Sequence, residues 1–373
     1  MRRMLAIALA LLLLGGVALA DKVPGNRLGL GLLSHLTDGK HNAFVSPVGL
    51  AWGLSMAAEG SGGETRQHLL KALDVEAPEE TAALASSLEE AGLRWANAAF
   101  ARQDLKLLPE YEARLTSVYG AGRFPLAGGE EADAWAREKT DGLVDGLPAF
   151  SQLEDARLVL LNALAMEAEW ASPFDPDQTW EDDFHAPEGD VRVPFMHQEV
   201  FAQYGEGLGM RYIQKAYMGG RFSMMLALPN TALKNALSQL KKNGMDCFQF
   251  RRNPVSVSLT MPKLDLCYDA DLSKAISAWG CWVPFHPDYA DYSGISDEKL
   301  VISEVSQRLR VQIDEGGTRA AAVTEVDMTK SAGHRLDDGD PVELVLDKPF
   351  LFIIFDRETG AVCFAGAVAN PLG

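Results

Sequence analysis

The pattern of apolar and polar positions changes along the chain, from helical spacing in the first half to alternation in the second. Leu50, Leu54 and Ala58 lie four residues apart, behind Ser46 and Pro47. A serine followed by proline at the first helical position is typical of a capped helix start. Further helices are predicted over residues 65–73, 131–147 and 271–279.

The second half of the chain is rich in predicted strands, each bounded by Gly, Pro, Asp or Asn. The strands are expected within residues 156–170, 222–229, 255–266, 309–314, 342–346, 350–356 and 362–371. Helices therefore come first and strands follow, which favours an α+β fold with large antiparallel or mixed sheets. No linker, repeat or low-complexity stretch divides the chain, so we expect one domain over residues 21–373.

The first twenty residues have the pattern of a signal peptide. Arg2 and Arg3 precede an apolar run over residues 5–14, and Ala18 and Ala20 form a small-x-small cleavage site. An uncleaved anchor is the alternative, but the run is short for a membrane span. We expect a secreted or periplasmic protein whose mature chain begins at Asp21.

Charge and motifs exclude several functions. The formal net charge is −18, residues 75–90 are acidic without a basic residue, and such a chain repels nucleic acid and anionic membranes. Ser55 lies on an apolar helix, not in a Gly-x-Ser-x-Gly turn, and neither a His-Glu-x-x-His motif nor a phosphate-binding loop is present. We expect no enzyme, no cofactor, no metal site and no membrane partner after signal cleavage.

Four cysteines leave two alternatives open. In an exported protein they could form up to two disulfides in three pairings. Alternatively all four are buried free thiols, because three of them lie among apolar neighbours. The cysteines are Cys247, Cys267, Cys281 and Cys363.

One segment combines a strand pattern with a loop composition. We expect Gly316 and Gly317 to act as a flexible hinge, because glycine accepts backbone angles that other residues refuse. After them, the even positions from Thr318 to Met328 are small or apolar, and the odd ones mostly tolerate water. Residues 330–340 are too polar to continue a buried strand and indicate an exposed loop. An ordinary half-buried strand followed by a loop is the alternative.

The sequence EGGTRAAAVT at 315–324 resembles the reactive-centre-loop hinge of serpins, Glu-x-Gly-Thr-x-Ala-Ala-Ala-x-Thr. NAFVSPVGLAWGLSMAAEGSGGET resembles the first core helix of that family, and LVLLNALAMEAEWASPF its central strand, with Thr179, Phe184 and VPFM following. MMLALPN, VSLTMPKLDL, ADYSGIS and the final DKPFLFIIFDRETGAVCFAGAVANP also fit. The resemblance covers residues 42–371 and identifies an exported bacterial member of the serpin family.

The resemblance implies the serpin fold, with three β-sheets, about eight or nine helices and an exposed reactive centre loop. It also implies a monomeric suicide inhibitor of a serine protease, with a cysteine protease as a further candidate target. The protease cuts the loop and forms an acyl-enzyme, and the cut loop then enters the main sheet as a strand. Thr318 is expected to become buried when this insertion begins. The alternative is a non-inhibitory serpin that acts as a binding or chaperone-like protein.

Site residues follow from the same resemblance. The loop hinge is expected at Glu315, Gly317, Thr318, Ala320, Ala321, Ala322 and Thr324. Trp170 and Glu315 are expected at the top of the insertion path, and Ser46, Asn162 and Gln307 where the strands part. The chain departs from the family at Gly49, usually serine, at Gln307, usually histidine, and at Arg319, usually acidic.

The family register, counted from Glu315, places the reactive bond between Ser331 and Ala332. A small residue there favours an elastase-like or subtilisin-like protease. The bond between Lys330 and Ser331 is the alternative and would suit a trypsin-like pocket, with Arg335 ranked third. The segment that follows is longer than is typical of the family, which blurs this count.

Overall fold

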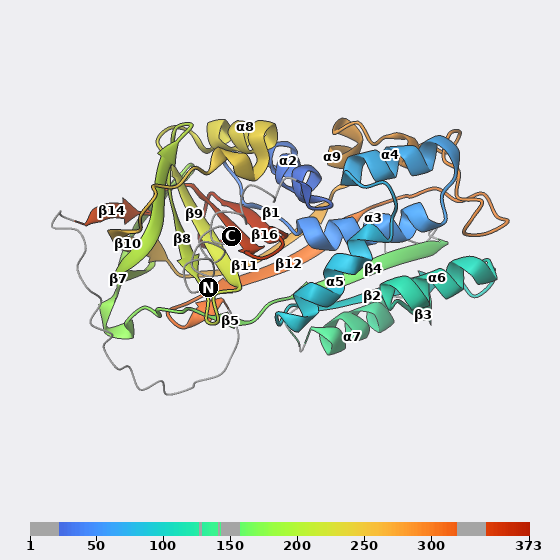
Figure 1. The fold of residues 1–373 in the computed structure, drawn as a ribbon, viewed down its shortest axis with the longest axis horizontal. Coiled ribbons are helices and arrows are strands. Elements are labelled where there is room, and N and C mark those ends of the chain that lie inside the picture. Colours follow the sequence, from blue (N-terminus) through green and yellow to red (C-terminus); the bar gives the residue numbers. More distant parts are fainter. Residues whose placement is uncertain (1–21, 127–128, 141, 143–156, 319–340) are drawn as a thin grey trace, which may run out of the picture.

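The computed structural model describes residues 22–126, 129–140, 142, 157–318 and 341–373 (Figure 1). Its largest sheet has nine strands, and β6 (Thr179–Ala186) pairs with β7 outside the main order. That order is β1 (Ala43–Val45), β16 (Val362–Val368), β15 (Phe350–Asp356), β9 (Phe222–Pro229), β8 (Met210–Ala216), β7 (Gly189–Gly207), β10 (Val255–Pro262) and β14 (Val342–Val345).

The centre of this sheet is covered on both faces. Every residue of β9, β15 and β16 is buried. A strand covered on both sides needs apolar residues at consecutive positions, and the sequences FSMMLALP, FLFIIFD and VCFAGAV supply them. The bounds of β9 and β15 agree with those predicted.

Two smaller sheets complete the β structure. One has the order β11 (Leu264–Asp271), β12 (Ser306–Ile313), β13 (Gly317–Thr318) and β5 (Ala168–Glu169). The other has the order β3 (Gly122–Pro125), β2 (Arg94–Ala101) and β4 (Leu158–Ala165). The predicted strand over 156–170 is therefore split, with β4 in one sheet and β5 in the other.

Eight α-helices lie within the described residues. They are α2 (Asn26–Leu36), α3 (Pro47–Glu59), α4 (Gly63–Leu73), α5 (Glu80–Glu90), α6 (Pro109–Tyr119), α7 (Gly129–Lys139), α8 (Leu233–Asn243) and α9 (Ser273–Ala278). The predicted start of α3 is confirmed, because Ser46 caps the helix by accepting a hydrogen bond from Gly49 N at 3.1 Å. Three sheets with helices around them confirm the α+β class.

Several elements were missed by the sequence pattern. The apolar run LGLGLL over residues 28–33 lies in α2 and is buried there. The strands β2, β7 and β8 also went unpredicted, as did α6 and α8. In β7 the exposed side chains are interrupted by pairs of buried ones, so period-two alternation is lost over its length.

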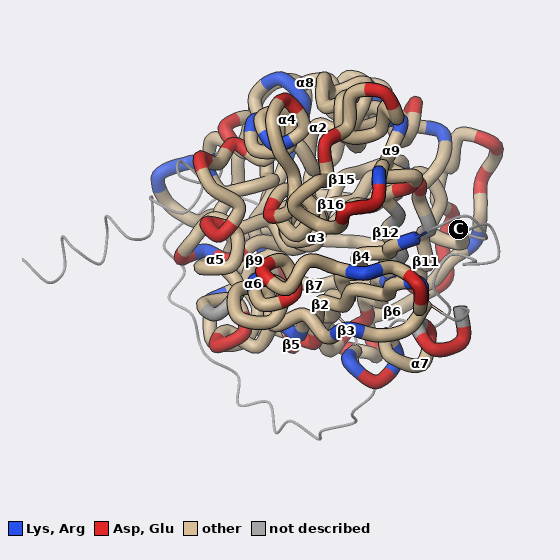
Figure 2. Tube along the Cα trace, turned by 90° about the vertical axis from the view of Figure 1, so that its right-hand side faces the viewer, with Lys and Arg blue, Asp and Glu red and all other residues tan. Residues whose placement is uncertain are grey.

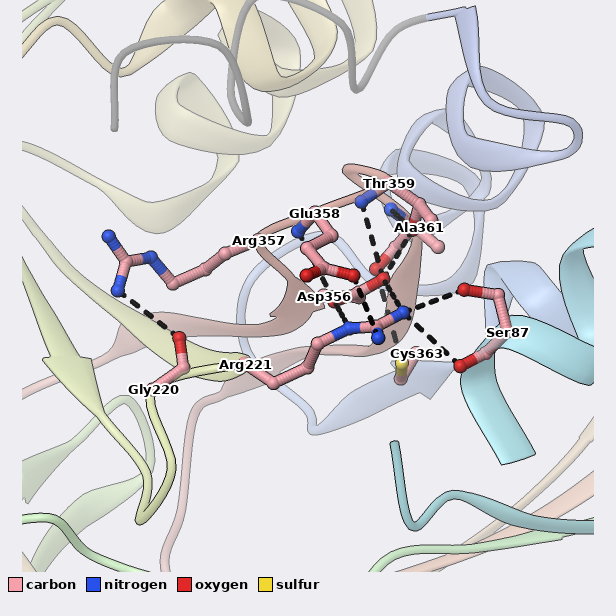
Figure 3. Close-up of polar contacts among 9 residues, drawn as sticks. All are labelled: Ser87, Gly220, Arg221, Asp356, Arg357, Glu358, Thr359, Ala361 and Cys363. Atoms are coloured by element: carbon pink, nitrogen blue, oxygen red, sulfur yellow. Dashed lines mark hydrogen bonds and ion pairs between the residues drawn. The ribbon is translucent and has the colours of Figure 1, made fainter. Parts of the chain in front are cut away.

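A buried ion pair fastens α5 to the turn between β15 and β16 (Figure 3). Asp356 is fully buried and accepts hydrogen bonds from Arg221 Nε at 2.7 Å and from Thr359 Oγ1 at 2.6 Å. Arg221 also donates to Ser87 Oγ at 2.7 Å and pairs with the exposed Glu358 at 2.8 Å. These bonds satisfy the buried carboxylate, and Asp356 therefore joins two parts of the fold that are distant in sequence.

All four cysteines are free thiols, so the disulfide alternative is wrong. Cys247, Cys281 and Cys363 are buried, and burial raises the pKa of Cys281 to about 12. The expectation that Cys267 is buried is also wrong. It lies between buried Leu266 and half-buried Tyr268 on β11, and strand alternation turns its side chain outward.

Acidic and basic positions are interspersed along the chain in the view of Figure 2, with acidic ones in excess. None of the described helices is both long and apolar enough to cross a membrane. Among the same residues, no group of three His, Cys, Asp or Glu side chains is placed to hold a metal ion.

Candidate functional site

The two small sheets are linked at one end by β13, and we call the unpaired stretch between β12 and β4 the gap. In the described chain β12 and β4 share no strand pairing, although β5 follows β4 directly in sequence. The two-residue strand β13 lies between β12 and β5, antiparallel to both, through Ile313 with Thr318 and Thr318 with Ala168. The 317–318 hinge therefore already occupies the first positions of a strand between them.

Backbone hydrogen bonds hold the hinge at this end of the gap. Trp170 N donates to Gly316 O at 2.8 Å, and Phe174 N donates to Glu315 O at 2.9 Å. The indole Nε1 of Trp170 donates to Asp314 O at 3.1 Å. The 170–174 segment thus grips the residues that lead into the loop.

Thr318 is buried in the uncleaved chain, which corrects one expectation. We expected this side chain to become buried only when insertion begins, but it is 7 % exposed and its Oγ1 shares a short hydrogen bond with Tyr217 OH. The Tyr217 ring stacks on Trp170 at 4.4 Å between centroids. The small hydroxyl residue fits because β13 leaves its side chain facing these two rings.

Glu315 is tied to two other elements. Its carboxylate accepts hydrogen bonds from Lys263 Nζ at 2.6 Å and from Thr179 Oγ1 at 2.7 Å. Burial opposes ionisation, but these two donors outweigh it and hold the pKa of Glu315 below its usual value. The charge therefore stabilises the docked hinge.

The two hinge glycines differ in their structural roles. We expected both to be needed for unusual backbone angles, but neither has a positive φ. Gly317 is needed for space, because a Cβ there would lie 2.2 Å from Ala168 O. At Gly316 a Cβ would meet Asp314 Oδ1 at 3.5 Å, an ordinary contact.

The residues expected where the strands part lie together at the start of α3. Gln307 on β12 accepts a hydrogen bond from Ser46 N and donates one to Ser46 O, both at 3.0 Å. Asn162 on β4 donates to Asn97 Oδ1 at 2.9 Å. A Cβ on Gly49 would lie 2.6 Å from Asn162 Oδ1 and 3.4 Å from Gln307 Nε2. The two departures from the family, Gly49 and Gln307, are thus linked in space, because glycine leaves room for the side-chain amides of Asn162 and Gln307.

The rest of the predicted loop lies outside the described residues. This applies to Ala320, Ala321, Ala322 and Thr324 of the hinge and to Lys330, Ser331 and Ala332 of the reactive bond. All other expected site residues are described, and they form two groups, one at the docked hinge and one beside α3.

Sequence reasoning missed the partners of the hinge. Tyr217 after β8, Lys263 between β10 and β11, and Thr179 on β6 contact it. Lys215 lies beneath the 170–174 segment. The resemblance named Thr179, but only as part of a segment. The local signal that could have drawn attention to Lys215 was a lysine within the half-buried strand sequence MRYIQKA.

The docked hinge lies between β12 and β5, and a second group of residues lies beside α3. The comparisons give the family of a chain with this arrangement. A family model described as Serpin (serine protease inhibitor) matches residues 25–371. An uncharacterized serpin-like protein of Thermococcus kodakarensis is 30 % identical over 365 residues, covering 91 % of this chain and 83 % of the relative. The chain therefore belongs to the serpin family.

Other relatives agree. Glia-derived nexin of Mus musculus is 27 % identical over 355 residues, covering 88 % of each chain. The crystal structure of the thermophilic serpin tengpin in its native state superposes with a TM-score of 0.81 at 26 % identity, covering 93 % of each chain. The serpin fold expected from the sequence is confirmed.

Proposed function

We propose that this protein is an inhibitory serpin that traps a serine protease by loop cleavage, acyl-enzyme formation and insertion of the cut loop. One observation carries the proposal. The hinge already forms two residues of strand between β12 and β5, at the bridged end of the gap between β12 and β4. Insertion then needs only to continue a strand that has begun.

If the inserted loop continued the β13 register, its residues would meet suitable neighbours. Thr318 pairs with Ile313 and Ala168, so two residues further Ala320 would pair with Val311 and Met166. Both neighbours are buried, as are Leu309 and Leu164, which would flank Ala322. Small side chains at even positions match these covered sites.

The same register accounts for two other residues. Thr324 would lie between Gln307 and Asn162, where its hydroxyl can bond to either amide. Arg319, a departure from the family, would lie beside Glu167, which is exposed. Directly opposed charges on neighbouring strands attract, so arginine suits the inserted state of this chain.

Incubation with a panel of elastase-like, subtilisin-like, trypsin-like and cysteine proteases tests the proposal. We expect a covalent complex that survives a denaturing gel with at least one serine protease. Cleavage without any complex would favour the non-inhibitory alternative, a binding or chaperone-like serpin. Ala320→Arg, which puts a charge against Val311 and Met166, is expected to convert the complex into cleaved protein.

Loop cleavage should also raise thermal stability. An ordinary surface nick removes a constraint, whereas a freed segment of about 15 residues at ~3.3 Å each can add a strand of roughly 50 Å. The melting temperature of the protein cut in residues 319–340 is the measurement. A lower melting temperature after cleavage would contradict insertion.

The reactive bond is proposed at Ser331–Ala332, with Lys330–Ser331 as the alternative. Mass spectrometry of the released C-terminal peptide distinguishes the two, because the fragment begins at Ala332 in the first case and at Ser331 in the second. We further propose export of a monomer after signal cleavage. Sequencing the N-terminus of the exported protein should give Asp21, and any retained leader would contradict this.

A further inference from the structure

A buried lysine lies beneath the segment that grips the hinge. Lys215 on β8 is 3 % exposed. Its Nζ donates to Ser172 O at 2.7 Å and to Gln198 Oε1. The same atom lies 4.5 Å from the ring centroid of Phe174 and 4.8 Å from that of Trp170. All contacts except Gln198 belong to the 170–174 segment.

The 170–174 segment connects this lysine to the hinge. Trp170 N and Phe174 N, at its two ends, donate to Gly316 O and Glu315 O. Trp170 also stacks on Tyr217, whose hydroxyl bonds to Thr318. A movement of the segment away from Lys215 would therefore release the hinge.

The ammonium group has no counter-ion among its contacts in the described chain. The charged or titratable side chains on β7, on β8 and beside the 170–174 segment are Glu169, Asp175, Asp190, Arg192, His197, Glu199, Glu206 and Arg211, together with the Lys263–Glu315 pair, which is satisfied within itself. None of them is a cause of the pKa shift of Lys215. Burial is the cause that lowers the pKa of Lys215, to about 7. Amide dipoles and ring faces compensate a buried charge less well than water does.

We propose that Lys215 is a positioning residue that makes the docking of the hinge sensitive to protons. When the amine is neutral, the 170–174 segment packs closed over it. When it is protonated, opening of the segment lets water reach the charge, so the hinge releases more readily. The biological purpose of this proton sensitivity rests on the proposed function, because easier release of the hinge would ease loop insertion.

The sign follows from linkage. A lysine with a lower pKa in the closed state than in the hydrated open state binds more protons when open. Closing is therefore favoured as pH rises between the two pKa values, by up to tenfold in the opening equilibrium per pH unit. Below about pH 7 the opening equilibrium should no longer depend on pH.

Hydrogen exchange of the uncleaved protein tests this without a protease. We expect the protection of the Trp170 and Phe174 amides, corrected for intrinsic exchange, to rise at least tenfold from pH 7 to pH 9. The Leu108 amide, bonded to Ile295 O far from the hinge, is the internal reference. Lys215→Met should give a flat profile with higher protection at pH 6. Lys241→Met, which removes an exposed lysine over Trp279, should keep the wild-type profile.

A second variant keeps the test decisive if Lys215→Met does not fold. Gln198→Met removes an acceptor from the ammonium, so the rise in protection should begin at lower pH. A wild-type profile that is flat or falls between pH 7 and pH 9, or a Lys215→Met profile like the wild type, would overturn the role of Lys215. Neither result bears on covalent trapping, and a failure of trapping would leave the exchange profile standing.

Discussion

Gly317→Ala tests whether docking of the hinge depends on close approach of two backbones. The added Cβ would lie 2.2 Å from Ala168 O and 2.8 Å from Glu169 Cα. Close carbon–oxygen contacts in sheets are about 3.3 Å, so β5 and β13 would have to separate by about 1 Å. Neither obstacle is a flexible side chain that could move aside.

The loss in the free energy of unfolding depends on which structural change relieves the clash at the lower cost. Overpacking that the backbone absorbs costs about 1–3 kcal/mol. Undocking the hinge instead loses the bonds of Thr318 and its neighbours, at about 1 kcal/mol each. Either route predicts a loss of about 2–3 kcal/mol in the free energy of unfolding of the native state. Gly316→Ala meets only Asp314 at 3.5 Å and has no positive φ to strain, so it should be neutral or stabilise by up to ~1 kcal/mol.

Urea unfolding of the two variants measures the difference. We expect Gly317→Ala to unfold at a lower urea concentration with an unchanged slope, and Gly316→Ala to match the wild type. Against a protease, Gly317→Ala should shift the outcome from complex towards cleaved inhibitor, because the inserted strand needs the same space. Equal urea midpoints for the two variants would refute the close-approach reasoning.

Three other predictions concern stability and inhibition. Thr318→Arg places a charge against Tyr217 and Trp170. A denaturing gel should then show cleaved inhibitor instead of the covalent complex. An unchanged stoichiometry of inhibition would contradict this prediction. Asp356→Ala leaves Arg221 without its buried partner and should lower the free energy of unfolding in urea by about 3–5 kcal/mol. The control Glu358→Gln removes an exposed partner and should lower it by less than ~1 kcal/mol. Similar losses for the two variants would show that the buried pair does not hold α5. The fold lowers the pKa of Glu315. The ionised carboxylate therefore stabilises the protein above its unfolded pKa of about 4.3, and this stabilisation is lost as pH falls through the lower pKa of the folded state. Lys263→Met should move that loss to higher pH, and identical acid unfolding profiles would count against the ion pair.

Local sequence signals were strongest where one physical rule decided the structure. Ser46 and Pro47 fixed the start of α3, because capping depends on neighbouring residues alone. The continuous apolar runs predicted β9 and β15 with their bounds. Alternation in β7 is broken by pairs of buried residues, and the strand pairs in turn with β6, β10 and β8. No local rule could find a strand whose burial depends on three distant partners.

The site shows the same division. Motif order named Glu315, Thr318, Trp170 and Asn162 as members of the two groups, and the described chain brings each group together. It could not reveal that Thr318 is already buried, since this depends on β5 and Tyr217, about 150 and 100 residues away in sequence. The reason for Gly317 was likewise misjudged, because a close approach of backbones leaves no local trace.

The amino-acid sequence by itself determined the family, the order of helices and strands, and the parity of the segment that is expected to insert. These depend on spacing, side-chain size and residue type, which are properties of neighbouring positions. The tertiary structure alone decided that the gap lies between β12 and β4 and that Gln307 and Gly49 share one space. It also decided that Lys215 is buried against the 170–174 segment, with no counter-ion among its contacts in the described residues. Each of these depends on which distant strands meet, and burial and pKa follow from such meetings.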